Sequence, residues 1–271
     1  MKTQITQSDI EKNVRSSKII LAMMFAMLAV FSERLVDFEG VLKSDNRLEF
    51  FGTVLVGLSI ISVFSPLLIR WSPWLLIIGL LPMLSENWHM YANHGWLAIW
   101  ILLAAPLTRC WWEDEDYWAY IRLTLGIVML AACIQKIMAG TYLDGSYITY
   151  LSYQGGTTEQ LFGFLCDPKV AIESGCSWHQ FIGLFLIAWQ ATVGLLLLFG
   201  WRSPIILFIE IAFLIGAGIY ADELNFQVLN IAFLCIAFGV GMPRWLAIIC
   251  SIMLLIDFFT LTRIVEHVLS T

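Results

Sequence analysis

Long apolar segments separated by short polar clusters make up most of this 271-residue chain. A helix needs roughly 20 mostly apolar residues to cross about 30 Å of hydrocarbon. Backbone polar groups cannot stay unpaired in lipid, so these segments are expected to be helices. The pattern predicts about nine membrane spans, of which the third and fourth are short. They fall near residues 19–36, 50–69, 73–86, 95–108, 119–138, 180–200, 204–220, 226–242 and 245–263.

Basic residues between the segments predict the orientation of the chain. Residues 1–18 are polar and basic, and an arginine follows the second, fourth, sixth and eighth segments. Cytoplasmic connections are enriched in Lys and Arg, so we expect the N-terminal segment in the cytoplasm and residues 264–271 outside. The transmembrane helical domain then covers residues 19–263, with a long outer loop at about 139–179.

Composition supports a membrane protein and excludes several other classes. Hydrophobic residues make up 59% of the chain and charged residues only 13%, whereas a soluble domain carries about 25% charge. We therefore predict an all-α, polytopic transmembrane bundle that contacts membrane lipid, most simply in the bacterial inner (plasma) membrane. The basic residues form no patch or stripe, which argues against a nucleic-acid partner.

Two cysteines, Cys166 and Cys176, lie in the predicted outer loop. That compartment permits disulfides, so we predict a bridge between them; the alternative is two unpaired loop thiols. The other cysteines lie in or beside predicted spans and are expected to pack as small apolar residues. These are Cys110, Cys133, Cys235 and Cys250. The sequence shows no CxxC pair and no His/Cys ligand cluster, so no metal is expected.

Polar residues near the predicted outer face are candidates for chemistry. Lys136 lies near the outer end of the fifth predicted span, and Asn93 and His94 begin the fourth. The predicted topology brings all three to one membrane depth. Lys136 either extends its amine to the headgroups or acts as a desolvated, proton-accepting base. For His94 the alternative is a hydrogen-bonded residue at the membrane rim.

Other polar residues are predicted deeper in the membrane. Charged groups inside spans are costly and are therefore candidates for function. Glu210 and Asp257 are candidate proton-relay groups, or inward-facing carboxyls kept neutral by burial. Gln190 and Asn230 are expected to form hydrogen bonds between helices.

Three short motifs resemble the HTTM family, the membrane domains related to vitamin K-dependent gamma-glutamyl carboxylase. The first is Tyr91-Ala-Asn-His-Gly-Trp-Leu97, the second is Gln135-Lys136, and the third is Asp144-Gly-Ser-Tyr-Ile-Thr-Tyr-Leu-Ser152. In that family an Asn-His pair opens a span at the outer face, and a later span ends in a lysine followed by Gly and a Tyr/Leu-rich stretch. The resemblance covers about residues 19–263.

The resemblance implies a cofactor, reduced vitamin K or a menaquinol-type lipid quinone in its reduced form. Lys136 would deprotonate the quinol, which then reacts with oxygen to give the epoxide and a strong base. That base removes a γ-proton from a peptide glutamate, and carbon dioxide adds. Asn93 and His94 would position the quinol oxygens. Only residues 264–271 stand where the carboxylase has a large lumenal domain, so we expect a peptide or protein substrate to be recognised through a partner protein.

Two further hypotheses stand beside the enzyme. The chain is alternatively a non-catalytic membrane partner in the maturation of, or immunity to, an exported peptide. The third hypothesis is a transporter with Glu210 and Asp257 as coupling groups. A transporter is disfavoured because the sequence shows no repeat and no broken helices.

Overall fold

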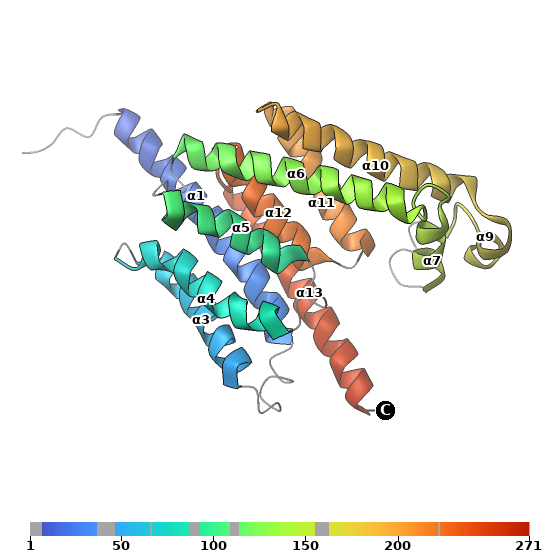
Figure 1. Cartoon of the computed structure of the whole chain (residues 1–271), viewed down its shortest axis with the longest axis horizontal. Coiled ribbons are helices and arrows are strands. Elements are labelled where there is room, and N and C mark those ends of the chain that lie inside the picture. The colour runs from blue at the N-terminus through green and yellow to red at the C-terminus, as the bar shows by residue number, and fades with distance from the viewer. Residues whose placement is uncertain are drawn as a thin grey trace, which may run out of the picture. The chain divides into compact units, whose positions relative to one another are not determined.

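A computed structural model describes residues 7–36, 47–65, 67–86, 93–108, 114–154, 163–221 and 223–270. Every regular element in these ranges is a helix (Figure 1). The chain divides into two compact units. The first unit contains Met1–Ile121 and Leu224–Thr271, and the second contains Arg122–Glu223. The division falls inside one long helix, α6 (Glu115–Ala139).

Within the described ranges, four helices are long and apolar enough to cross a membrane. They are α1 (Gln7–Val36) over its part Arg15–Ser32, α6 (Glu115–Ala139), α10 (Ser177–Leu198) and α11 (Pro204–Ala221). Their length and hydropathy confirm the predicted membrane protein and the all-α class. The count of nine spans and the orientation of the termini stay predictions.

The other five predicted segments are also helical over much of their length. They are α3 (Arg47–Val63), α4 (Ser72–Glu86), α5 (Asn93–Thr108), α12 (Leu224–Ala237) and α13 (Arg244–Ser270). The second predicted segment was too long, because the sequence has a proline at position 66 and proline disfavours helix in the residue before it. A short 3₁₀ turn, η1 (Ile69–Trp71), precedes α4. α13 includes the ninth predicted segment and continues past residue 263.

In the first unit, α12 is the buried helix, and it packs against α1 and α13. All its residues from Gln227 to Ala237 are buried, as expected for a helix that is apolar all round. The chain then turns through Gly239 and Gly241, which have φ of 65° and 64°. This turn ends the helix earlier than predicted. It also lies against α1, because the Met242 N–H donates to the Lys18 carbonyl oxygen at 2.9 Å.

In the second unit, α6 and α10 lie side by side (Figure 1) and cross closely at two glycines. A Cβ built at Gly126 would lie 2.9 Å from the carbonyl oxygen of Gly194, and one at Gly194 would lie 3.2 Å from that of Gly126. Small residues allow membrane helices to approach at their backbones. The crossing therefore fixes the register of α6 against α10, that is, which residues of the two helices lie opposite each other.

Two short helices in the second unit were not predicted. They are α7 (Ser146–Gln154) and α9 (Pro168–Ser174), and both lie inside the predicted loop. Asp167 caps α9 by accepting the Lys169 N–H. Asp144 similarly accepts the Ser146 N–H at 2.9 Å, a hydrogen bond that lowers the pKa of its carboxyl. Such Asp residues are recognised helix-start signals, so the beginnings of α7 and α9 could have been predicted from the sequence.

Candidate functional site

The amine of Lys136 is held between two membrane helices. Lys136 lies in the last turn of α6 and is half-buried. Its Nζ donates to Oε1 of Gln190 on α10 at 2.9 Å. This bond confirms Gln190 as an interhelical hydrogen-bonding residue. It also shows that the amine is turned toward a neighbouring helix.

An aromatic pair flanks the same amine. Gly140, with φ of 75°, follows α6 and allows the chain to turn back. Nζ of Lys136 then lies 5.3 Å from the ring centroid of Tyr142, within the range of a cation–π contact. The Tyr142 ring stacks on Tyr147 with centroids 4.4 Å apart. Burial raises the pKa of the Tyr142 phenol above its ordinary value, so this hydroxyl stays protonated.

Close backbone contacts hold this turn against α10. A Cβ at Gly183 would overlap the carbonyl oxygen of Tyr142, and a Cβ at Gly145 would overlap the backbone nitrogen of Gln180. Gly145 also has φ of 80°, a conformation that favours glycine. The turn therefore rests directly on the helix backbone, which places Tyr142 beside Lys136.

A second polar link joins α10 to α11. Nε1 of Trp189 donates to Oε2 of Glu210 at 2.7 Å, and only 2% of Glu210 is exposed. The Trp189 ring also lies 5.8 Å from that of Phe213. Trp189 precedes Gln190, so two consecutive residues of α10 bond to two different helices. Glu210 is thus buried as predicted, and one of its carboxyl oxygens accepts a hydrogen bond from tryptophan.

Three other predicted site residues belong to the first unit. Asn93 and His94 begin α5 in the first unit, and their side chains lie outside the described residues. Asp257 is buried in α13, also in the first unit. The two units are described separately, so the expected proximity of His94 to Lys136 stays a prediction.

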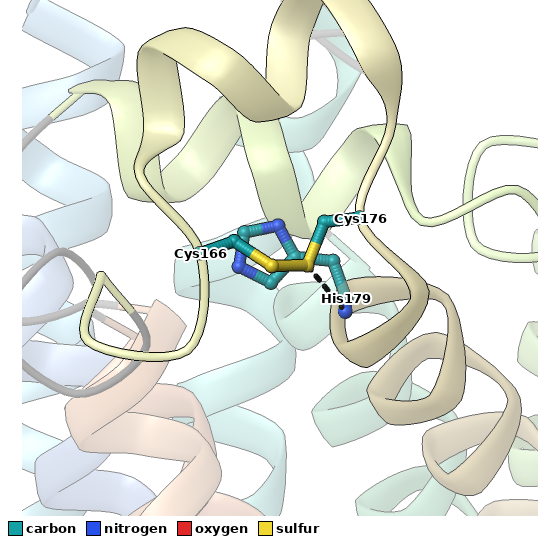
Figure 2. Close-up of side chains that lie close together, drawn as sticks. All are labelled: Cys166, Cys176 and His179. Carbon is teal, nitrogen blue, oxygen red and sulfur yellow. Dashed lines mark hydrogen bonds between the residues drawn. A yellow bond between two sulfur atoms is a disulfide. The ribbon is translucent and has the colours of Figure 1, made fainter.

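The predicted disulfide joins Cys166 and Cys176, with Cα atoms 6.4 Å apart. Cys176 is the N-cap of α10, and its Sγ accepts the N–H of His179 at 3.4 Å. Figure 2 shows the His179 ring beside the bridge. Among the described cysteines, the unbridged ones are all buried, in agreement with a packing role. They are Cys133, Cys235 and Cys250.

The expectation that the chain has no His/Cys cluster was wrong. One ring nitrogen of His179 and the two sulfur atoms lie within 4.8 Å of one another. The signal that was missed is Cys176-Ser-Trp-His179. Residues three apart share one helix face, and the bridge brings Cys166, a second cysteine, to the same place.

Replacing Gln190 with leucine is expected to lower the stability of the protein by about 1–2 kcal/mol. The substitution removes the acceptor of a half-buried amine, and hydrogen bonds between membrane helices contribute on the order of 1 kcal/mol. Unfolding in mixed detergent measures the loss. In a double-mutant cycle with Lys136→Met, the two effects should be less than additive. Full additivity would contradict a direct bond.

Reducing the disulfide without added metal is expected to destabilise the second unit by about 3 kcal/mol. The bridge closes a loop with a sequence separation of 10, and the chain-entropy model gives about this value for such a loop. The midpoint of thermal unfolding should fall on reduction. A Cys166→Ser/Cys176→Ser double variant should have the midpoint of the wild-type protein with its disulfide reduced, and reductant should not change it. If reductant lowers its midpoint too, the effect comes from elsewhere.

The fold and this site define a helical integral membrane protein in which the amine of a lysine in the last turn of α6 bonds to the neighbouring helix α10. The chain matches no protein-family model, no curated protein and no solved structure.

Proposed function

We propose that the chain is a membrane enzyme of the HTTM type that uses a lipid quinol and oxygen, with Lys136 as the base. The observation that carries the proposal is the environment of the Lys136 amine. Among the described residues, its hydrogen-bond acceptor is the neutral amide oxygen of Gln190 and not a carboxylate. A base of this kind must be able to give up and accept a proton near neutral pH.

The donor set around Lys136 fits a quinol. When bound, a quinol supplies an acidic hydroxyl and the electrons that reduce oxygen. Lys136 accepts the hydroxyl proton, Gln190 orients the amine, and the Tyr142 ring lies beside the amine, with its centroid 5.3 Å from Nζ. The sequence motif adds Asn93 and His94 as residues that position the quinol oxygens.

The finer features of the proposal rest on sequence. Nine spans, a cytoplasmic N-terminus and an outward C-terminus would place Lys136 at the outer face of a bacterial inner membrane. The oxidised bridge in the second unit supports that side, since disulfides persist in oxidising compartments. The acceptor would be a glutamate of a peptide or protein, recognised with a partner protein.

Quinol-dependent oxygen uptake by purified protein tests the proposal. Uptake that is lost in Lys136→Ala and kept in Glu210→Gln supports the enzyme. If Glu210→Gln abolishes the activity of the protein in cells and Lys136→Ala does not, a transporter is favoured instead. If neither residue matters, the chain acts as a non-catalytic partner of an exported peptide.

A further inference from the structure

We propose that Cys166, Cys176 and His179 form a Zn²⁺-binding site once the disulfide is reduced. The two Sγ atoms and a ring nitrogen of His179 already lie within 4.8 Å of one another. Thiolate sulfur and imidazole nitrogen are the ligands that Zn²⁺ takes most often, with water in a remaining position. In the oxidised protein both sulfur atoms are used by the bridge, so the disulfide and the metal exclude each other. This inference is independent of the chemistry at Lys136.

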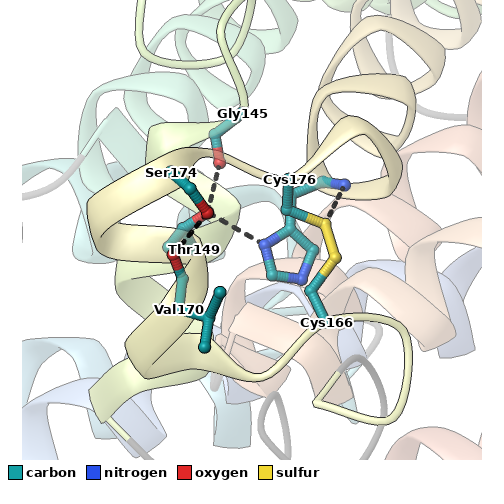
Figure 3. Close-up of a disulfide and its surroundings, with 7 residues drawn as sticks. Gly145, Thr149, Cys166, Val170, Ser174 and Cys176 are labelled. Atoms are coloured by element: carbon teal, nitrogen blue, oxygen red, sulfur yellow. Dashed lines mark hydrogen bonds between the residues drawn. A yellow bond between two sulfur atoms is a disulfide. The ribbon is translucent and has the colours of Figure 1, made fainter.

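Thr149 links the ring of His179 to the backbone of Gly145. Its Oγ1 lies 3.1 Å from the carbonyl oxygen of Gly145 (Figure 3) and 2.9 Å from Nδ1 of His179. When the hydroxyl donates to Gly145, its oxygen accepts from Nδ1 in the tautomer of His179 that carries its hydrogen there. A neutral imidazole that donates through Nδ1 presents its lone pair on Nε2. Metal-binding histidines use this arrangement, in which the second nitrogen is fixed by an oxygen acceptor.

The three ligands lie at or beside the beginnings of two helices. Cys176 and His179 lie at the N-cap and in the first turn of α10, a helix of 22 residues. His179 is fully buried, with 0% of its surface exposed. Cys166 stands next to Asp167, which caps α9. Preorganised ligands lower the cost of ordering a metal site, and here the helix ends supply that order before any metal binds.

Access to the bridge determines how it opens. Cys166 is half-buried and Cys176 is buried, so a reductant attacks the sulfur of Cys166. The sulfur of Cys176 then leaves as a thiolate, which the N–H of His179 and the N-terminus of α10 stabilise.

The reduction balances with a water-soluble phosphine as reductant. The S–S bond breaks and gains two electrons, and the phosphine becomes its oxide with oxygen from water. The two protons of that water go to the two sulfurs. When Zn²⁺ binds, both thiols ionise and release these protons.

The test uses the full chain purified in detergent under nitrogen, with and without phosphine treatment. Co²⁺ serves as a spectroscopic substitute for Zn²⁺. Reduced protein is expected to bind about one equivalent of Co²⁺ with thiolate-to-cobalt charge-transfer absorption, which Zn²⁺ then removes. Oxidised protein is expected to show no such absorption. Identical spectra from the two forms would overturn the proposal.

Substitutions identify the ligands. Cys176→Ser should remove the charge-transfer absorption. Thr149→Val leaves all three ligands in place and should weaken Co²⁺ binding about 10- to 100-fold, as other changes to the partners of metal ligands do. Cys235→Ala removes a buried thiol of the first unit and should have no effect. Charge-transfer absorption that persists in Cys176→Ser, or an unchanged Co²⁺ affinity in Thr149→Val, would contradict the assignment.

A measurement on the unmodified chain covers the case in which a variant fails to fold. In reduced protein, Zn²⁺ should slow alkylation of Cys166 and Cys176, located by mass spectrometry of the peptides. The rate at Cys133 should not change. Equal alkylation of the two bridge cysteines with and without Zn²⁺ would refute the site.

Discussion

Replacing Lys136 with alanine is expected to reduce quinol-dependent oxygen uptake by about 10²- to 10⁴-fold, the usual contribution of a general base. The amine would no longer accept the quinol proton, while α6 keeps its length because alanine is the best helix former. Oxygen consumption by purified protein with a reduced naphthoquinone measures the rate. The rate in buffer without protein gives the background.

Two matched variants separate a base from a structural cation. Lys136→Arg keeps the positive charge and can still donate to Gln190, but arginine does not give up its proton in proteins. It should be as inactive as Lys136→Ala. Lys169→Ala removes an exposed lysine on α9 of the same unit and should be fully active. Wild-type rates in Lys136→Arg would refute the base, and background rates in the wild type would leave the partner role as the better hypothesis.

Gly183→Ala is expected to destabilise the protein by about 3 kcal/mol, at the upper end of the usual cost of overpacking. The added methyl group would overlap the carbonyl oxygen of Tyr142. That atom is part of the backbone, so relief requires the whole turn to move off α10. The thermal unfolding midpoint and the monodisperse fraction in detergent should both fall. Because the turn carries Tyr142, oxygen uptake should fall as well.

Gly216→Ala is the control for this substitution. Gly216 also lies inside an apolar helix of the second unit, α11. No atom lies within 4 Å of a Cβ built there. Alanine in place of a helical glycine is favourable by about 0.5–1 kcal/mol when space allows. Gly216→Ala should therefore match or exceed the wild type in stability, and equal stability of the two variants would argue against a tight contact at Gly183.

Sequence alone predicted the class of fold and several of its contacts. Lipid requires long apolar helices, so segment positions followed from hydropathy. The Cys166–Cys176 bridge followed from the loop, and the bonding role of Gln190 followed from its place in a span. The same prediction for Asn230 was wrong, because its Nδ2 donates to Oε1 of Gln227 within α12. Helix ends were less well predicted. The turn after α12 at Gly239 depends on packing against distant parts of the chain, which local sequence does not record.

The sequence did not predict which residue accepts the hydrogen bond of Lys136. Lipid is as apolar as a protein interior, so hydrophobic periodicity does not fix how a membrane helix is rotated about its axis. Gln190 and Lys136 could be assigned to α10 and α6, but not to facing sides. The close crossing at Gly126 and Gly194 supplies that information, and it depends on both helices at once. For Asn93 and His94, the sequence remains the only guide.

The consecutive residues Trp189 and Gln190 have a consequence for how this protein can change over evolution. Successive residues of a helix point about 100° apart, so the pair can reach α11 and α6 together only at one rotation of α10. Two close backbone contacts also fix the position of α10 along its axis. Gly183 lies against the turn at Tyr142, and Gly194 lies against α6 at Gly126. An insertion or deletion between these glycines would shift Trp189 and Gln190 relative to one of the two glycine contacts. Descendants of this chain are therefore free to exchange lipid-facing side chains, but the length of α10 between Gly183 and Gly194 should be inherited unchanged.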